Sequence, residues 1–207
     1  MKNLSRCGFL LGATLVLGVG AFGQGPSQAK YSEQARQSIQ HHWDPKRDEW
    51  QKPDEVIRKL ELRSGDVVAD LGCGPGYFTL RLARAVGPTG KVYAVDIDAE
   101  ILDYVKKRAK AEGLDNIDII VAEPHDPKLP PASLEMIFMC NTLHWIKGRV
   151  TYYPILVRAL KPHGRLVNID WRRITKSDVI RELETAGFQL VYSWEFLADQ
   201  YYLVFEQ

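Results

Sequence analysis

Short apolar runs alternate with longer amphipathic segments along most of this chain. Five runs are continuous, short and rich in β-branched residues, as expected for buried strands, and they cover residues 67–70, 92–95, 117–121, 136–140 and 165–169. Between them, residues 100–112 and 150–160 carry apolar positions at helical spacing and stop at Gly113 and before Pro162. This alternation predicts an α/β fold with a mostly parallel sheet and helices on both faces.

The two ends of the chain depart from that alternation. Toward the C-terminus, Ser177 caps a predicted helix over residues 177–186, and two aromatic-rich strands follow at residues 188–196 and 201–205. At the other end, residues 25–40 are polar and rich in glutamine and serine, which predicts a linker. Residues 41–207 then make one domain, long enough to bury an adequate core.

Residues 1–24 have the pattern of a secretory signal peptide. Lys2 and Arg6 precede an apolar run over residues 9–22, and small residues follow it. There is no twin arginine, and Cys7 precedes the run, so we expect a Sec-type leader and a periplasmic or secreted domain. The run is shorter than the roughly 20 residues of a membrane span, so no stable insertion of the domain is expected. An uncleaved signal anchor that tethers the domain to the membrane is the alternative.

Charge and composition narrow the range of partners. The 207 residues include 27 basic and 26 acidic side chains, for a net charge of +1, and no basic tract is interleaved with aromatic residues. Nucleic acid is therefore not an expected partner. His125 and His163 have no second ligand at the spacing of a metal site, so we predict no metal.

A glycine-rich loop after the first apolar run carries the strongest chemical signal. In V-V-A-D-L-G-C-G-P-G-Y, which starts at residue 67, Gly72, Gly74 and Gly76 permit positive φ and let a ligand lie against bare peptide groups. A dinucleotide fingerprint needs a small residue where this chain has Tyr77, which disfavours an NAD-dependent oxidoreductase. Asp70 suits a cationic amine better than a pyrophosphate. The loop indicates a nucleoside-type cofactor without a phosphate.

A second acid strengthens this interpretation. The next apolar run ends in Asp96, about 20 residues beyond the glycines, which is the spacing of nucleoside-binding βαβ units. An acid at this position binds a ribose diol.

Four motifs together resemble the class I S-adenosylmethionine-dependent methyltransferases, over residues 54–207. V-A-D-L-G-C-G-P-G is similar to the cofactor loop, V-Y-A-V-D-I-D to the ribose strand, L-P-P-A-S-L-E-M-I-F to the approach to the fourth strand, and L-K-P-H-G-R-L-V to the turn before the fifth. The segments W-D-P-K-R-D-E-W-Q-K-P and E-P-H-D-P-K-L-P look most like small bacterial members, loosely similar to the ubiquinone and arsenite methylating groups. His163 replaces the second glycine of the usual turn, and we expect this surface change to be tolerated.

The resemblance implies a Rossmann-like, doubly wound sheet of seven strands with a C-terminal antiparallel hairpin. It also implies S-adenosyl-L-methionine as the cofactor. The methionine end of the cofactor would lie against the first loop, at the carboxylate of Asp70 and the backbone of Gly72, Cys73, Gly74 and Gly76.

The remaining cofactor contacts follow from the same resemblance. Asp96 would bind the ribose hydroxyls, Ile97 one face of the adenine, and Asn141 would sit beside the sulfonium. Either Glu123 or Asp126 would accept a hydrogen bond from the adenine amino group, because neighbouring prolines leave the register open. For these two acids a solvated turn residue or a helix cap is the alternative.

His144, in C-N-T-L-H-W after the fourth run, is the candidate general base. Displacement at a sulfonium methyl asks the protein mainly to align a nucleophile and exclude water, and a base helps when the acceptor is an oxygen or nitrogen acid. The alternative is a histidine that hydrogen-bonds a loop or shapes the pocket with Trp145.

An aromatic and basic segment precedes the glycine loop. It contains His41, His42, Trp43, Arg47 and Trp50. Two interpretations stay open: a lid that folds over the cofactor, or an amphipathic helix packed on the sheet edge.

Cys73 and Cys140 would fall at the C-terminal ends of neighbouring strands. An oxidising compartment allows them to pair. Two small buried thiols are the favoured alternative, because a bridge would constrain the loop that must close on the cofactor.

Two functions from different classes remain. The first is an enzyme that moves a methyl group to a small-molecule acceptor, and the second is an exported, non-catalytic cofactor-binding or interaction protein that keeps the fold. Export sharpens the choice, because S-adenosylmethionine is made and used inside cells. Either cofactor reaches the compartment, or the leader is not processed, or the domain no longer catalyses transfer. We expect the enzyme.

Overall fold

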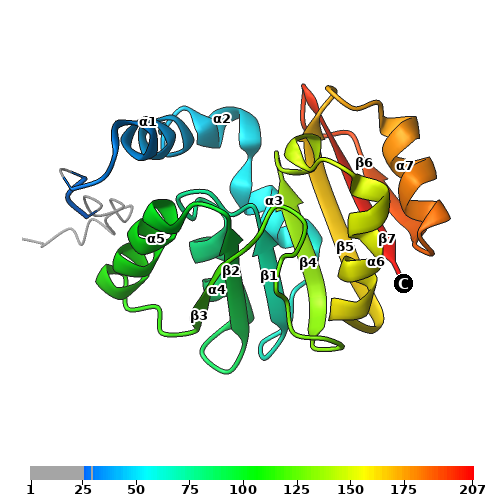
Figure 1. The fold of residues 1–207 in the computed structure, drawn as a ribbon, viewed down its shortest axis with the longest axis horizontal. Helices are drawn as coiled ribbons and strands as arrows, with labels where there is room; N and C mark the ends of the chain where they lie inside the picture. The colour runs from blue at the N-terminus through cyan, green and yellow to red at the C-terminus, as the bar shows by residue number, and fades with distance from the viewer. Residues whose placement is uncertain (1–25, 29) are drawn as a thin grey trace, which may run out of the picture.

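The computed structural model describes residues 26–28 and 30–207, so the predicted leader lies outside the described residues. In this part of the chain seven strands form one sheet, in the order β3-β2-β1-β4-β5-β7-β6 (Figure 1). The strands are β1 Val67–Leu71, β2 Lys91–Asp96, β3 Ile117–Val121, β4 Leu134–Cys140, β5 Leu160–Trp171, β6 Gln189–Trp194 and β7 Gln200–Glu206. The first five are parallel, and β7 runs antiparallel to both β5 and β6. The predicted doubly wound sheet with a closing hairpin is confirmed.

Helices cover both faces of this sheet. One face carries α3 (Pro53–Leu60), α4 (Thr79–Val86) and α5 (Ala99–Ala111), and the other carries α6 (Arg149–Ala159) and α7 (Lys176–Thr185) (Figure 1). On β2, Val92 and Ala94 belong to the apolar clusters of the first face, whereas Tyr93 and Val95 belong to the cluster of the second. Because β2 is buried on both faces, all of its positions favour apolar residues, which explains the continuous apolar run in the sequence.

The segment before α3 is more ordered than its composition predicts. Its first helix, α1 (Glu33–His42), corrects the linker predicted over residues 25–40, which is helical in its second half. The Ser32 hydroxyl caps α1 by accepting from the Ala35 amide, and Ala35 and Ile39 are buried against α5. Two apolar residues four positions apart therefore anchor a helix that is otherwise polar.

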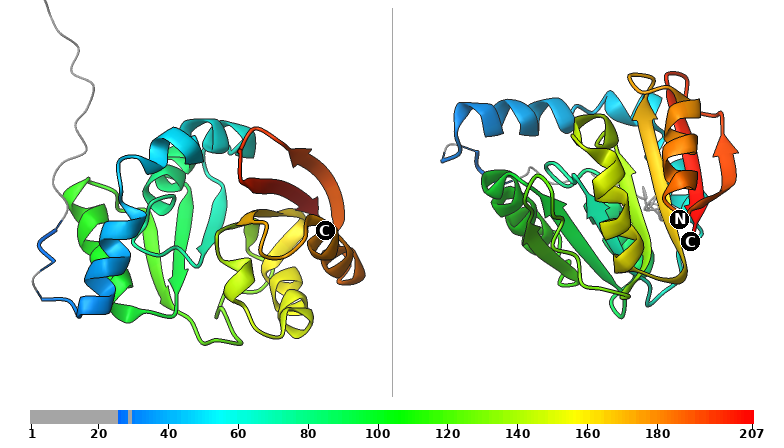
Figure 2. Two further views of the ribbon diagram at one scale, coloured as in Figure 1. Left: turned by 90° about the horizontal axis from the view of Figure 1, so that it is seen from above. Right: turned by 45° about the vertical axis from the view of Figure 1, so that its right-hand side comes forward.

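The order of the strands reverses beside β1, which has β2 on one side and β4 on the other. Loops that leave these strands diverge to opposite faces, and ligands bind in the crevice that this opens at the carboxyl ends. Asp70 lies in register with Ala94 and with Phe138, so the ends of β1, β2 and β4 meet at one edge. Above this edge cross α1 and a short helix, α2 (Arg47–Gln51), at the top of Figure 1 and of the right-hand view in Figure 2.

Two local details differ from the sequence-based expectations. Thr175, not Ser177, caps α7, because its hydroxyl accepts from the Asp178 amide at 3.1 Å. In the first part of β5, where the sequence predicts a turn before the strand, His163 takes a left-handed conformation with φ +62°, which explains why the family pattern has glycine at this position. Among the described helices, none is long and apolar enough to cross a membrane.

Candidate functional site

The glycine loop is fastened to the neighbouring strand ends. The amides of Gly72 and Cys73 both donate to the Val95 carbonyl, at 2.8 and 3.0 Å. Gly72 has φ +72°, and a Cβ there would overlap the side chain of Thr142, whose hydroxyl donates to the Gly72 carbonyl at 3.3 Å. Gly74 has φ +52° and open space where a Cβ would stand. The first glycine is therefore needed for packing and the second leaves room for a ligand.

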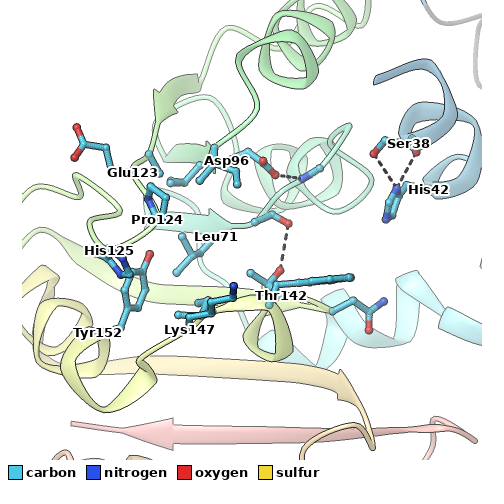
Figure 3. Close-up of a pocket in the computed structure, with 18 residues that line it drawn as sticks. Ser38, His42, Leu71, Asp96, Glu123, Pro124, His125, Thr142, Lys147 and Tyr152 are labelled. Atoms are coloured by element: carbon cyan, nitrogen blue, oxygen red, sulfur yellow. Dashed lines mark hydrogen bonds between the residues drawn. The ribbon is translucent and has the colours of Figure 1, made fainter. Parts of the chain in front are cut away.

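A cavity of about 500 Å³ opens beside this loop. Its walls come from α1, from the loops after β1 to β4 and from the start of α6, as Figure 3 shows. Among the residues predicted to bind cofactor, six line it: Gly72, Gly74, Asp96, Ile97, Glu123 and Asn141. This volume suits a drug-sized ligand.

Asp96 is held rigidly at the end of β2. One carboxylate oxygen accepts from the Gly74 amide at 2.9 Å (Figure 3). The other accepts from the Asp98 amide at 3.1 Å. Burial raises the pKa of Asp96 above its ordinary value, although these amides oppose the shift. Ile97, the next residue, is 65% exposed and gives the cavity an apolar wall. The pair offers a fixed acceptor for hydroxyl groups beside a flat apolar surface.

The structure distinguishes the two candidate acids after β3. Glu123 lines the cavity and its carboxylate pairs with Lys128 at 2.9 Å, whereas Asp126 lies outside the lining and accepts from the Lys128 amide at 2.8 Å. The backbones of Glu123 and Asp126 bond each other in both directions. Asp126 therefore has the geometry of a turn residue, which was the alternative to a cofactor contact. Glu123 is the acid that lies at the cavity.

Asp70 lies beneath the loop and not in the cavity wall. Its carboxylate is 2% exposed and accepts from the Thr79 hydroxyl at 2.6 Å. Burial raises the pKa of Asp70 to about 7, and the Thr79 hydroxyl bond opposes the shift. Asp70 therefore changes charge near neutral pH, at the base of the loop.

Three further residues at this edge stay outside the cavity wall. Gly76, with φ +86°, packs against Val105 of α5, and Cys73 is buried behind the loop. Cys73 and Cys140 are both free thiols, so the structure does not contain the bridge between them. Burial raises the pKa of Cys73 well above its ordinary value and that of Cys140 to about 12, which keeps both thiols neutral at physiological pH.

His144 forms a buried dyad with an acid that the sequence analysis missed. It belongs to a short 3₁₀ helix, η1 (Leu143–Trp145), and its Nδ1 lies 2.5 Å from Asp170 Oδ1 at the end of β5. Asp170 is fully buried and also accepts from the backbone amides of His144 and Trp171, at 3.2 and 2.8 Å. Burial raises its pKa, while His144 opposes the shift. A sequence signal for Asp170 was present, because it follows the fifth apolar run directly. Asp70 and Asp96 stand at the corresponding ends of the first two runs.

His144 itself is not part of the cavity wall, but its neighbours Thr142 and Trp145 are. An ionised Asp170 accepts a hydrogen bond from the Nδ1–H group of His144, which leaves Nε2 as the basic nitrogen. Asp170 therefore orients the His144 ring in the way that the acid of a catalytic dyad orients its histidine.

The predicted aromatic and basic segment both packs and covers. α1 ends in this segment, packs on α5 and contributes Ser38 and His42 to the cavity wall (Figure 3). The Trp43 indole donates to the Pro75 carbonyl in the glycine loop at 3.0 Å. Burial lowers the pKa of His42, so a neutral imidazole faces the cavity. Within the described ranges, no group of three acidic, histidine or cysteine side chains is placed to hold a metal ion.

Comparison with known proteins places this site in a family context. A model described as "Methyltransferase domain" matches residues 68–164. Curated relatives include a demethylmenaquinone methyltransferase of Geobacillus stearothermophilus, 30% identical over 58% of this chain and 51% of its own length, and a 2-phytyl-1,4-naphtoquinone methyltransferase of Trichormus variabilis, 35% identical over 57% and 52%. The chain thus spans about half the length of these relatives.

Solved structures extend the likeness over the whole domain. An S-adenosylmethionine-dependent methyltransferase from Aquifex aeolicus superposes with a TM-score of 0.78 at 27% identity, over 86% of this chain and 99% of its own. A putative methyltransferase from Haloferax volcanii, solved with an activator protein, reaches a TM-score of 0.71 at 15% identity, over 85% and 98%, and shares the fold.

Proposed function

The chain belongs to the class I S-adenosylmethionine-dependent methyltransferases, and on that premise we propose that it transfers the methyl group of S-adenosyl-L-methionine to a small-molecule acceptor. One observation carries the proposal: a single cavity at the switch point is lined by a rigid acid, Asp96, by the open face of Gly74 and by Asn141.

The residues around the cavity fit the cofactor of this family. The Asp96 carboxylate is fixed by two amides and suits a ribose diol, and the exposed Ile97 suits the face of an adenine. Glu123 is the acid within reach of an amino group at that end. When bound, S-adenosyl-L-methionine supplies a methyl group on a sulfonium, which a nucleophile displaces.

The chain's own residues then have three tasks. Asp96 and the glycine loop orient the bound molecule, and α1 with Ser38 and His42 covers the cavity and excludes water. His144 takes a proton from the acceptor at Nε2, while Asp170 holds its Nδ1 proton and stabilises the imidazolium. A base of this kind contributes about 10²–10⁴-fold in rate.

The names of the curated relatives guide the choice of acceptor. Two of them carry the names of naphthoquinone methyltransferases. Reduced naphthoquinones and simple hydroxylated aromatics are therefore the first acceptors to test on this chain. Export by the leader over residues 1–24 remains part of the proposal, supported by its sequence pattern, and N-terminal sequencing of the mature protein from the native cell tests it.

Calorimetric titration with S-adenosyl-L-methionine and S-adenosylhomocysteine tests the cofactor site. We expect micromolar binding by the wild-type protein, loss of binding in Asp96→Ala, and retention in Asp118→Ala, an exposed acid on β3 outside the cavity wall. A folded wild-type protein that binds neither molecule would overturn the proposal.

Turnover separates the enzyme from the non-catalytic alternative. Release of S-adenosylhomocysteine in the presence of an acceptor supports the enzyme. Tight cofactor binding without turnover across the acceptor panel favours an exported protein that keeps the fold for binding alone.

A further inference from the structure

A buried polar cluster lies at α2 and includes Asn141, which also lines the cavity. We name it the α2 cluster, and it consists of Arg47, Gln51, Cys140, Asn141 and Gln200. The Gln51 amide donates to Gln200 at 2.8 Å, and the Gln200 amide donates to Asn141 at 2.5 Å. Arg47, Gln51 and Gln200 are 7%, 0% and 1% exposed. Segments that are distant in the sequence thus meet in a polar group inside the protein.

Arg47 is the charged member of the α2 cluster and has only neutral partners. Its guanidinium donates to the His42 carbonyl at 3.2 Å and more weakly to Gln51 at 3.4 Å and the Cys140 sulfur at 3.9 Å. Its Nε has no hydrogen-bond partner, and its plane lies over the Tyr77 ring at 3.8 Å. In the part of the chain that the structure describes, no carboxylate forms an ion pair with it. A buried charge in such surroundings is costly unless an anion neutralises it.

A second buried arginine shows what this fold does when the role is structural. Arg108 on α5 is 5% exposed and lies over the Trp43 ring at 3.8 Å, so its burial and stacking match those of Arg47. The Nε of Arg108, like that of Arg47, makes no hydrogen bond to the residues that the structure describes, but unlike Arg47 it lies 2.9 Å from a carboxylate, that of Glu112, and forms an ion pair with it. The missing acid at Arg47 therefore marks a position where a ligand can supply the negative charge.

The α2 cluster adjoins the cavity at two points. Arg47 donates to the carbonyl of His42, and Asn141 accepts from Gln200, while His42 and Asn141 are themselves part of the cavity wall. Asp96, Ile97 and Glu123, where the nucleoside is proposed to bind, line the same cavity. A molecule that approaches the methyl group from beyond Asn141 meets the α2 cluster.

Aromatic rings surround the same guanidinium. Beside Tyr77, the rings of Phe78 and Trp50 lie 5.7 and 5.9 Å from it, and Trp50 packs against Trp171 at 5.2 Å. Trp50 is 40% exposed, so this aromatic pair reaches the surface. The surroundings combine one unneutralised cation with flat apolar walls, which suits a flat anion.

We propose that the α2 cluster is the acceptor subsite and that Arg47 binds an anionic oxygen of an aromatic acid, a carboxylate or an ionised ring hydroxyl, which is a different group from the hydroxyl that His144 deprotonates. This inference rests on the proposed methyl transfer. The acceptor oxygen replaces the long contacts of Arg47 to Gln51 and Cys140, and the ring packs beside Trp50. Because Gln51 is fully buried here, α2 must move aside for the acceptor to enter.

Matched aromatic probes test the charge requirement. With S-adenosylhomocysteine at saturation, 2-naphthoate and its neutral isostere 2-naphthamide are titrated into the full-length protein, and tryptophan fluorescence and calorimetry are recorded. We expect 2-naphthoate to bind at least about tenfold more tightly than 2-naphthamide. Arg47→Met should abolish the preference and Arg47→Lys should keep part of it, whereas Arg108→Met, the matched buried arginine, should keep it fully.

The outcomes separate this inference from the proposed function. Equal affinity for the two probes, no binding of either, or a preference that survives in Arg47→Met would overturn the acceptor subsite. Unchanged binding of S-adenosylhomocysteine by Arg47→Met shows that the variant is folded and that the cofactor site is intact. Failure of the wild-type protein to bind S-adenosylhomocysteine would instead count against the proposed function, and the probes are then titrated alone.

Discussion

Replacing Asp70 by asparagine should change how the stability of this protein depends on pH. Asp70 is 2% exposed, and burial raises its pKa to about 7, compared with about 3.9 in an unfolded chain. Between these values the folded state holds a proton that the unfolded state has released. The folded state is therefore favoured at low pH, and this contribution is lost as the pH rises through 7.

The size of the effect follows from the two pKa values. Between pH 5 and pH 8 the folded Asp70 loses nearly all of its proton, and the unfolded one has little left to lose. Integrating the difference in bound protons gives about 2–3 kcal/mol less unfolding free energy at pH 8 than at pH 5 from this residue alone. Asp70→Asn resembles the protonated acid and can still accept from the Thr79 hydroxyl, so it should lack this decline.

Urea unfolding at pH 5, 6, 7 and 8 measures the difference, because other titrating groups contribute equally to both proteins. Asp115→Asn, in an exposed loop, controls for the loss of a carboxylate as such. Parallel curves of unfolding free energy against pH for wild type and Asp70→Asn would refute the reasoning, since they would mean that Asp70 does not hold a proton at neutral pH in the folded state.

Three other sets of substitutions test separate features of the site and of the fold around it. His144→Ala should lower kcat by about 10²–10⁴-fold with S-adenosylhomocysteine affinity unchanged, and Asp170→Asn should lower it in the same direction; an unchanged rate in steady-state assays would remove the dyad from the mechanism. Gly72→Ala should destabilise the protein by more than Gly74→Ala, because the new methyl group at position 74 faces open space and adds only the left-handed strain of about 1 kcal/mol. Adding Thr142→Ala should recover part of the unfolding free energy that Gly72→Ala loses, as measured by urea unfolding. A double variant no more stable than Gly72→Ala alone would contradict the predicted overlap. His163→Gly should raise the unfolding free energy by about 0.5–1 kcal/mol, because His163 is held at φ +62° with an exposed side chain; a fall in stability would show that its contact with Glu206 matters more than the strain.

The sequence predicts the fold and one edge of the site well, for a simple physical reason. Parallel strands bring their C-terminal ends to the same edge, so a residue that follows an apolar run can be placed without knowing any tertiary contact. Gly72, Asp96 and Asn141 all follow this logic and all line the cavity. Asp70 satisfies the same rule yet lies beneath the loop, because whether the last residue of a strand points toward the cavity or into the fold depends on the pleat.

Contacts between distant segments were beyond the reach of sequence reasoning. His144 was predicted from its position, but its partner Asp170 depends on the pairing of η1 with the end of β5. The α2 cluster is more extreme, since Gln51 meets Gln200 from the far end of the chain. The polar residues of α1 gave no sign of a packed helix, because only Ala35 and Ile39 are buried. Such contacts are set by tertiary packing and have no periodic signature.

Opposite charges gathered at one edge of the sheet link the two parts of the proposed site. Burial disfavours the ionised forms of Asp70 and Asp96. The positive charge of Arg47, which forms no ion pair with a carboxylate of the described residues, lowers the pKa of Asp70. The ligand-free protein is therefore less stable with each of these buried charged groups than it would be with an apolar residue of similar volume at the same position. Because the equally buried Arg108 is neutralised by Glu112, we expect the groups at the proposed binding edge to become paired when ligands bind. On this argument, Arg47→Met should move the decline of unfolding free energy that Asp70 causes to higher pH. If the midpoint of that decline stays in place, Arg47 and Asp70 do not interact electrostatically.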